Sequence, residues 1–457
     1  MHSTSIKQLL HEHRSYFATG ITKDPSFRLE QLRVLRKALT DNEDALFHAL
    51  KEDLNKPAFE AYGGESAIVL HEIDHALRHL RCWSKPRRVR TPLAFFPARC
   101  FIHPVPFGVA LIIGPWNFPV QLMLAPLAGA MAAGNCAVLK PSITAPHTSH
   151  IIMKLISENF DPAYVSIVEG GAETAQALLE ERFDHVFFTG GVASGRLVMA
   201  AAAKHLTPVT LELGGKNACI VDADAPLDIT ARRIAFGKFF NAGQSCVAVD
   251  YLLVDRRIKQ ALLSRILKYT VEFYGEDASR SPDYARIVNE QHFDRLLGLL
   301  HAGDIMIGGG SDRANRYIAP TVIDGITGNE PIMEDEIFGP LLPVISYDDL
   351  SEAIEFVNSR PRPLALYFFS RNAAHQERVL AGTSSGGGCI NDTVVHETVT
   401  GLPFGGVGDS GMGKYHGKAS FDTFTHERSI VRNGFLVDVF LRYPPYRDHL
   451  RWLKKLF

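Results

Sequence analysis

Val109-Ala110-Leu111-Ile112-Ile113 opens the stretch of sequence that decides the fold. This short apolar run is typical of a buried strand, and the helical pattern of 122–133 follows it. Ala137-Val138-Leu139 is a second apolar run, and another helical pattern begins near His147. Strands and helices that alternate in this way predict a parallel sheet with helices on both faces. The expected fold class is therefore α/β, with a doubly wound nucleotide-binding domain.

The flanking segments extend this domain and add a second one. The first eighty residues carry apolar side chains at near-helical spacing, and prolines break that pattern from Pro86 to Pro106. A second alternating set begins after Glu212, with 217–221 as a strand and 229–240 as a helix. It continues to about Asn391, so the chain of 457 residues is expected to form two α/β domains.

Composition restricts the classes of partner and the compartment. The formal net charge is −2 and the pI is about 6.8, which gives no reason to expect nucleic acid or an anionic membrane as the principal partner. Six cysteines without paired spacing favour a reducing compartment, and the N-terminus has no apolar signal core. Cytoplasmic location is therefore expected.

Two segments have features of membrane contacts. The apolar stretch 118–139 is long enough to span a bilayer, but Pro119, Gln121, Pro126 and Asn135 interrupt it, so we expect no integral membrane segment. The last residues, 447–457, are amphipathic at helical spacing, with basic and apolar side chains alternating. Docking on a membrane is one interpretation of this segment, and packing on the protein's own surface is the one we favour.

A cysteine and a carboxylate indicate the chemistry. Cys246 ends the run Phe-Asn-Ala-Gly-Gln-Ser-Cys of 240–246, and Glu212 lies in Leu-Glu-Leu-Gly-Gly-Lys of 211–216. A thiolate adds readily to a carbonyl carbon, and a carboxylate in a dry site can activate the water that later releases an acyl group. The pair therefore predicts acyl chemistry through a thioester.

Further motifs in the same order give a family resemblance. Pro-Trp-Asn-Phe-Pro of 115–119 and Glu-Ile-Phe-Gly-Pro of 336–340 accompany the two runs above, and together they resemble the aldehyde dehydrogenases from about Lys51 to about Ile430. Gly-Met-Gly-Lys-Tyr-His-Gly of 411–417, followed by Phe-Asp-Thr-Phe of 421–424, resembles the class 3 branch in particular.

The resemblance implies a fold and an assembly. It implies two doubly wound α/β domains, one for the cofactor and one for catalysis, with a small oligomerisation arm. The expected ranges are 1–83 and 107–211 for the dinucleotide-binding domain, 212–417 for the catalytic domain, 84–106 and 418–431 for the oligomerisation strands, and 432–457 for a C-terminal extension. A homodimer is expected, because class 3 relatives also extend their C-terminus beyond the joining strand.

The resemblance also implies roles for three catalytic residues. Cys246 would be the nucleophile, and Asn117 with the backbone N–H of Cys246 would stabilise the oxyanion. Glu212 would be the general base; its alternative is a structural carboxylate that caps the Gly214-Gly215 turn. An ordinary thiol titrates near 8.5, so Cys246 needs help from a helix N-terminus, a cation or the bound cofactor, and the sequence leaves these three sources open.

The expected cofactor is NADP or NAD. Gly190, Gly191 and Gly195 surround a strand-to-helix turn at which backbone N–H groups can approach a pyrophosphate. Many NAD-specific relatives carry a glutamate where this chain has Ile143, so its absence favours NADP while NAD stays possible. The remaining candidates come from the family motifs: Lys140 beside a ribose or phosphate, Glu336 on the nicotinamide ribose, Phe338 against the nicotinamide, and Trp116.

The substrate is expected to be an aromatic or a medium- or long-chain aliphatic aldehyde. Trp116, Phe118 and Tyr62 could line an apolar tunnel to Cys246, and 396–401 could shape its mouth. Two other functions remain open: a coenzyme-A-acylating dehydrogenase, against which Glu212 argues, and a non-catalytic binding protein on the same fold. No metal site is expected, although three histidines share one helix face at positions 71, 75 and 79.

Overall fold

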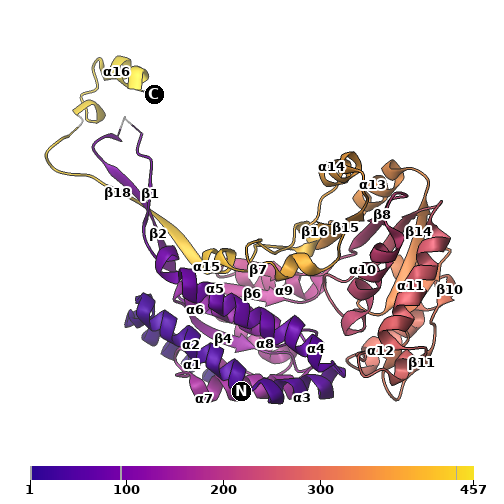
Figure 1. Cartoon of the computed structure of the whole chain (residues 1–457). Helices are drawn as coiled ribbons and strands as arrows, with labels where there is room; N and C mark the ends of the chain where they lie inside the picture. The colour runs from indigo at the N-terminus through magenta and orange to yellow at the C-terminus, as the bar shows by residue number, and fades with distance from the viewer. Residues whose placement is uncertain (1–2, 93–94, 439, 457) are drawn as a thin grey trace.

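Two sheets covered by helices form the body of the molecule (Figure 1). The computed structural model describes residues 3–92, 95–438 and 440–456. Within these ranges one sheet has six strands in the order β17-β7-β6-β3-β4-β5, and the other has seven in the order β10-β13-β14-β9-β8-β15-β16. The expected alternation of strands and helices is thereby confirmed.

The six-stranded sheet belongs to the N-terminal part of the chain. Its central strands are wholly buried, as their unbroken apolar runs predicted, and helices cover both faces. Its strands are β3 (Val109–Ile113), β4 (Cys136–Lys140), β5 (Val165–Ile167), β6 (His185–Thr189), β7 (Val209–Glu212) and β17 (Gly411–Met412). Its helices are α1 (Ser3–Ala18), α2 (Pro25–Asp41), α3 (Glu43–Leu54), α4 (Ala58–Ala61), α5 (Ala67–Trp83), α6 (Gln121–Ala133), α7 (Pro146–Asn159), α8 (Ala172–Glu180) and α9 (Val192–Ala203).

The seven-stranded sheet carries the second set of elements. Its strands are β8 (Ala218–Val221), β9 (Tyr251–Asp255), β10 (Asp304–Ile307), β13 (Thr321–Asp324), β14 (Leu341–Tyr347), β15 (Ala365–Phe369) and β16 (Gly387–Ile390). Its helices are α10 (Leu227–Phe239), α11 (Lys259–Tyr274), α12 (Glu290–Leu299), α13 (Leu350–Asn358) and α14 (Ala373–Gly382). A separate two-stranded ribbon consists of β11 (Ser311–Asp312) and β12 (Tyr317–Ile318).

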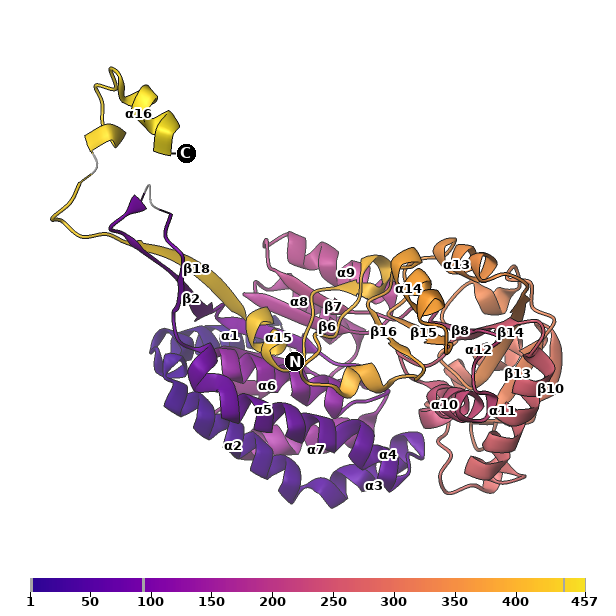
Figure 2. The same cartoon turned by 45° about the horizontal axis from the view of Figure 1, so that its top comes forward.

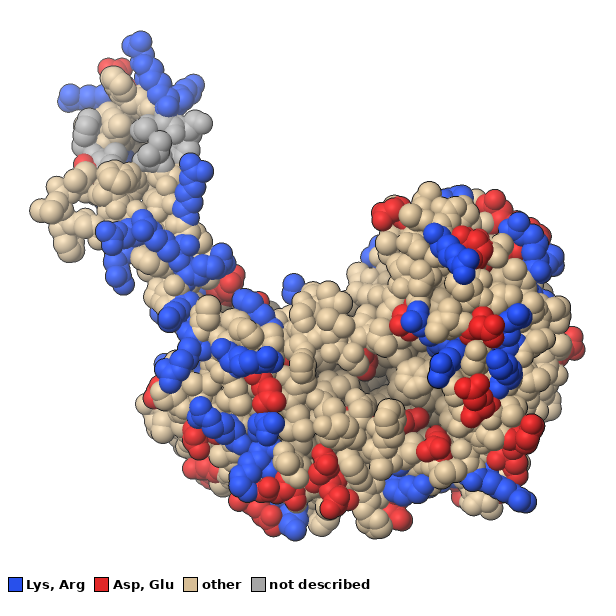
Figure 3. Space-filling view, in the orientation of Figure 1, with Lys and Arg blue, Asp and Glu red and all other residues tan. Residues whose placement is uncertain are grey.

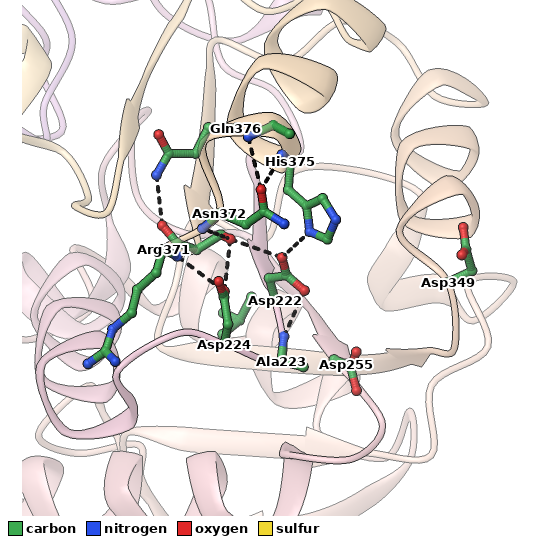
Figure 4. A network of polar contacts seen from close by, with 12 residues as sticks. Asp222, Ala223, Asp224, Asp255, Asp349, Arg371, Asn372, His375 and Gln376 are labelled. Atoms are coloured by element: carbon green, nitrogen blue, oxygen red, sulfur yellow. Dashed lines mark hydrogen bonds and ion pairs between the residues drawn. The ribbon is translucent and has the colours of Figure 1, made fainter.

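Polar contacts hold the neighbouring strands β8 and β15 together where both end (Figure 4). Ser370 follows β15, and its hydroxyl lies 2.9 Å from a carboxylate oxygen of Asp222 and 2.8 Å from one of Asp224, both of which follow β8. His375 Nδ1 lies 2.6 Å from the same Asp222 carboxylate. The loops that leave the two strands are thus fixed to each other.

Two segments differ from the elements expected for them. β17 pairs antiparallel with β7 through Gly411 and Glu212, so this part of the range expected for the catalytic domain joins the six-stranded sheet. Residues 418–423 form the helix α15 (Lys418–Thr423), where a joining strand was expected. The physical reason is its packing on α6: Phe421 is buried, and a Cβ on Gly129 would lie 2.8 Å from that of Ser420.

A long arm extends from this body, as both cartoon views show (Figures 1 and 2). It consists of β1 (Arg87–Val89), β2 (Arg99–Pro106) and β18 (Thr425–Arg432). β18 pairs antiparallel with β2 along its whole length, from Thr425 opposite Pro106 to Arg432 opposite Arg99. Lys and Arg side chains gather on the arm and on the chain beyond it (Figure 3).

The C-terminal helix α16 (His449–Leu456) lies beyond the arm, far from both sheets (Figures 1 and 2). Leu450, Trp452 and Leu453 are 60%, 56% and 46% exposed. Our expectation that this segment packs on the protein's own surface was therefore wrong for the single chain, because the arm holds it away from the two sheets. Among the described residues, no helix combines the length and apolar character needed to cross a membrane.

Candidate active site

A cavity of about 310 Å³ brings together residues from distant parts of the chain. All three predicted catalytic residues, Asn117, Glu212 and Cys246, line it. Five of the eight predicted cofactor residues line it as well, namely Trp116, Gly190, Gly191, Glu336 and Phe338. The other three, Lys140, Ile143 and Gly195, are outside its lining.

The turn before Cys246 has an unusual backbone. After α10 ends, Asn241, Ala242 and Gly243 have φ of 48°, 52° and 73°, three successive residues in the left-handed region. Only glycine adopts this region freely, and a Cβ on Gly243 would lie 2.3 Å from the carbonyl oxygen of Gly339. The sharp turn directs the residues that follow into the cavity.

Buried amides fix the segment that carries the nucleophile. The Gln244 side chain donates to the carbonyls of Asn241 (3.0 Å) and Arg286 (2.9 Å) and accepts from the N–H of Val288 (3.0 Å). Asn217 Nδ2 donates to the carbonyl of Cys246 at 2.7 Å. Sequence reasoning missed both amides, because Arg286 and Val288 are remote from Gln244 in the chain, as Cys246 is from Asn217.

The thiol of Cys246 is not activated by its own surroundings in this structure. Burial raises its pKa well above the ordinary value, and the carboxylates of Glu397, Glu336 and Glu212 raise it further. Its own backbone N–H acts in the opposite direction and lowers the pKa. Of the three sources of help left open above, a neighbouring cation has no support among the groups that act on this thiol.

Glu212 ends β7, and its carboxyl group is buried. Neither side-chain oxygen accepts a hydrogen bond, and burial raises the pKa of the carboxyl group well above its ordinary value. A capping carboxylate would accept backbone N–H bonds, so the alternative role as a cap of the Gly214-Gly215 turn has no support here. A carboxyl group held without partners beside a thiol is suited to exchange a proton with a water molecule.

Asn117 is held by a buried ion pair that the sequence did not reveal. Asn117 Nδ2 donates to the carbonyl of Gln244 at 3.2 Å, and Lys56 Nζ donates to the backbone carbonyl of Asn117 at 2.9 Å. Lys56 also pairs with Glu65 at 2.6 Å, and both side chains are fully buried. Glu65 in turn accepts the N–H groups of Val120 and Gln121 at the start of α6 (2.9 and 3.0 Å).

We predict that Lys56→Met lowers the free energy of unfolding by about 3–5 kcal/mol, because it leaves the carboxylate of Glu65 buried without its cation. It should also lower kcat by about 10- to 100-fold, since Asn117 loses a positioning contact. Chemical denaturation and steady-state rates measure the two effects. The control is Lys56→Met combined with Glu65→Gln, which removes the uncompensated charge and should recover part of the stability. A double variant as unstable as the single one would contradict the ion-pair explanation.

The features on the cofactor side of the cavity suit a dinucleotide. Glu336 Oε1 is buried without a hydrogen-bond partner, and burial raises the pKa of this carboxyl group to about 8. A Cβ on Gly214 would lie 1.8 Å from Glu336 Oε2, so only glycine allows this approach. Phe338, with a φ of 50°, meets the ring of Trp116 edge-on with centroids 5.3 Å apart.

The three glycines of the predicted turn have two different roles. Gly190 and Gly191 lie between β6 and α9, and Gly191 is the N-cap of α9 without a side-chain cap, which leaves backbone N–H groups for an anion. Gly195 lies within α9, where a Cβ would be 2.6 Å from Leu213 Cδ2. Gly195 therefore allows α9 to pack closely on Leu213, which follows β7.

Lys140 ends β4 and Ile143 follows it, and both are outside the cavity lining. The Lys140 ammonium group donates to the carbonyls of Pro141 (2.9 Å) and Gly170 (2.5 Å), and burial lowers its pKa. Ile143 is 60% exposed, so it is accessible to a ligand that lies along the ends of β4 and β5. Their cofactor roles stay predictions.

A second cavity of about 220 Å³ is lined mostly by apolar residues, and we call it the apolar tunnel. Phe118 lines it and directly follows Asn117, which lines the first cavity. Of the other aromatic residues proposed for a tunnel, Trp116 lines the first cavity, whereas Tyr62 packs on Phe47 with ring centroids 6.5 Å apart. The tunnel is lined by Phe59, Glu60, Gly63, Gly64, Ile68, Phe118, Phe236, Phe240, Val394, Val395, Glu397 and Thr398.

His292 and Arg295 also line the first cavity and were missed in the sequence. His292 packs on Trp116 with centroids 5.1 Å apart, and Arg295 donates to the carbonyl of Ile337 at 2.5 Å. They lie three residues apart on α12, a spacing that places both on one helix face. That spacing was the only available signal, and it is common on surface helices.

The chain is similar to known proteins along most of its length. The model of the aldehyde dehydrogenase family matches residues 3–430. The 4,4'-diaponeurosporen-aldehyde dehydrogenase of Staphylococcus aureus (strain NCTC 8325 / PS 47) is 47% identical over 454 residues, 99% of each chain. The dimeric NADP-preferring aldehyde dehydrogenase of Canis lupus familiaris is 45% identical over 444 residues, 97% of this chain and 98% of the relative. A solved structure of the substrate-bound state of Staphylococcus aureus AldH matches with a TM-score of 0.97 at 46% identity and covers 99% of both chains.

Proposed function

The chain belongs to the aldehyde dehydrogenase family, and from this premise we propose that it oxidises aromatic and medium- or long-chain aliphatic aldehydes to carboxylic acids through a cysteine thioester. The predicted family, the fold class and the use of NAD(P) are confirmed by the relatives. The observation that carries the proposed mechanism is that Cys246, Glu212 and Asn117 line one cavity together with the cofactor candidates.

The site fits a nicotinamide dinucleotide. Glu336 Oε1 is a buried acceptor without a donor, as a ribose hydroxyl would require. The uncapped start of α9 beside Gly190 and Gly191 offers backbone N–H groups to a pyrophosphate. When bound, the nicotinamide ring accepts a hydride from the substrate carbon.

In the proposed first half-reaction the Cys246 sulfur, as thiolate, adds to the aldehyde carbon. The carbonyl oxygen then gains negative charge, which Asn117 Nδ2 and the backbone N–H of Cys246 stabilise by hydrogen bonds. The amide stays neutral, so it supports the oxyanion without protonating it. Loss of a hydride from this tetrahedral carbon leaves a thioester on Cys246.

In the second half-reaction Glu212 accepts a proton from water, and the resulting hydroxide equivalent adds to the thioester carbonyl. The carbon–sulfur bond then breaks, which releases the carboxylic acid and returns Cys246 as thiolate. The buried, unpartnered carboxyl group of Glu212 supports this role over transfer of the acyl group to coenzyme A, which needs no water-activating base. A non-catalytic binding protein would not require these three groups in one cavity.

The test is a set of initial rates with benzaldehyde and decanal, each with NAD and with NADP. The apolar lining of the tunnel supports both substrate classes, and the Staphylococcus aureus relative is named a 4,4'-diaponeurosporen-aldehyde dehydrogenase. Formation of NAD(P)H with equimolar carboxylic acid supports the proposal. Activity restricted to added coenzyme A would favour the acylating alternative.

We propose that the enzyme prefers NADP, because Ile143 places no carboxylate near the adenosine ribose. Ile143→Glu is therefore expected to lower kcat/KM for NADP by at least about tenfold, through repulsion of the 2′-phosphate, while that for NAD rises. Steady-state rates with each cofactor measure the effect. Ile143→Gln is the matched control, since it adds hydrogen-bonding capacity without charge. Equal cofactor ratios in all three proteins would contradict the role of position 143.

We also propose a homodimer joined through the arm, in a reducing compartment such as the cytoplasm. The arm built from β2 and β18, with most of β18 exposed, and the dimeric relative support the assembly. The compartment is supported by the six cysteines, none of which is disulfide-bonded. The test is the mass measured by sedimentation for the full chain and for a variant that lacks residues of β18.

A further inference from the structure

The apolar tunnel contains a carboxylate that the proposed mechanism does not use. Glu397 lies on the short helical turn Val395–Thr398, which follows β16. Most of the tunnel lining is aromatic or aliphatic, and its lining includes no Lys, Arg or His. Glu397 is half-buried, so its carboxylate faces an otherwise mostly apolar lining without being sealed off from a molecule that enters the tunnel.

The polar side chains of the tunnel differ in one respect. Glu60 Oε2 accepts the backbone N–H of Asn241 at 2.9 Å, and the Thr398 hydroxyl donates to the carbonyl of Val395 at 2.9 Å. The Glu397 carboxylate makes no hydrogen bond or ion pair with any described residue. Its acceptor capacity is therefore available to a molecule in the tunnel.

The loop that carries Glu397 is held firmly against the second domain. Val394, just before the turn, has a φ of 54°, which a β-branched residue adopts only when its surroundings enforce it. Thr393 Oγ1 donates to the carbonyl of Arg233 on α10 at 2.8 Å. A Cβ on Gly237 would lie 2.3 Å from Thr393 Oγ1. Glu397 thus belongs to a segment whose backbone is fixed by its contacts.

Glu397 also acts on the reaction centre. Its carboxylate contributes most among the charges that raise the pKa of the Cys246 thiol. Burial raises the pKa of Glu397 itself to about 7, and His416 lowers it. Geometry links the two cavities through neighbouring residues, because Phe118 lines the tunnel with Glu397 and Asn117 lines the cavity with Cys246.

Resting on the proposed aldehyde oxidation, we propose that Glu397 selects substrates: it accepts a hydrogen bond from a hydroxyl or ammonium group on an otherwise apolar aldehyde and excludes aldehydes that carry a carboxylate. A donor on the substrate satisfies the lone carboxylate, whereas a second negative charge in the same tunnel is repelled. The preferred substrates are then hydroxylated or aminated aldehydes with an apolar body.

The test compares the 3- and 4-isomers of hydroxymethylbenzaldehyde with those of carboxybenzaldehyde at pH 8, with saturating NADP and with saturating NAD. These pairs have similar size and differ in the presence of a donor or a negative charge. The readout is the ratio of kcat/KM, hydroxymethyl over carboxy, within each protein. In the wild type this ratio should reach at least about 100 for one isomer pair.

Glu397→Gln keeps a neutral acceptor, so the ratio should fall at least about tenfold, mainly because the carboxylated substrate improves. Glu397→Val removes the acceptor as well, so the rate with the hydroxymethyl substrate should also decline. Glu377→Gln, which neutralises an exposed carboxylate on α14, is the matched control and should leave the ratio unchanged. Melting temperatures establish that each variant is folded.

Equal ratios in the wild type and both Glu397 variants would overturn the inference while leaving aldehyde oxidation intact. A wild type that oxidises none of the benzaldehydes would instead overturn the proposed aromatic substrate class, and this inference with it. The two failures are distinguished by decanal, which tests the proposed aliphatic activity separately.

Discussion

Cys246→Ala is expected to lower NAD(P)H formation from any aldehyde by at least about 10⁴-fold, because alanine has no nucleophile to form the thiohemiacetal. The cavity lining shows no second thiol beside Asn117 and Glu212 among the described residues. Initial rates with benzaldehyde and decanal measure the loss. The variant should remain folded, since the turn before Cys246 is held by backbone and amide contacts and not by the sulfur.

Cys82→Ala is the matched control, because Cys82 is an exposed thiol at the end of α5. It should retain wild-type rates. Inactivation of the wild type by iodoacetamide, with protection by a bound aldehyde, would identify the same sulfur independently. Substantial turnover by Cys246→Ala would exclude the thioester mechanism.

Glu212→Gln is expected to lower steady-state kcat by about 10²- to 10⁴-fold while preserving a rapid first turnover. The acyl group should still form on Cys246 but should not be hydrolysed without the base. Rapid mixing of enzyme with aldehyde and NADP should therefore show a burst of NADPH close to one per active site, followed by slow release. Mass spectrometry should detect the acylated chain.

The control for this variant is Glu158→Gln, at an exposed position on α7. It should show wild-type kcat. A Glu212→Gln protein that lost the burst as well as the steady state would place Glu212 in the first half-reaction, as the acceptor of the thiol proton.

The pH dependence has a defined sign. Glu212 acts as a base only when ionised, and burial raises its pKa well above the ordinary value. The wild-type rate of thioester hydrolysis should therefore rise with pH through that raised pKa. Cys246, whose pKa is also raised, adds a rise in the first half-reaction. In Glu212→Gln the rise due to Cys246 should remain and the rise due to Glu212 should be lost. Single-turnover rates measured against pH therefore separate the two groups.

The parts of the fold that the sequence predicted are those set by local pattern. The run from Val109 to Ile113 is apolar throughout because the strand is buried on both faces, and the structure confirms it as β3. The segment 418–423 shows the limit of this reasoning. Its helical form depends on contact with α6 and Gly129, which are remote in the chain.

The same distinction applies to the site. Cys246, Glu212 and Asn117 belong to compact motifs, so they could be singled out. Lys56 and Glu65, which hold the Asn117 loop, are separated from it by more than fifty residues and carry no motif of their own. The unpaired carboxylate of Glu397 was also beyond prediction, because only the structure shows that its neighbours supply no donor.

The arm has a consequence for how cells must handle newly made chains. β18 is an edge strand, and beyond it Phe435 and Leu436 are fully exposed in the single subunit. Open strand edges and exposed aromatic side chains promote aggregation and recognition by chaperones and proteases. Under the proposed assembly, a subunit without its partner would be degraded quickly. When little of the chain is synthesised, few subunits find a partner, so the amount of enzyme should rise more than proportionally with the rate of synthesis.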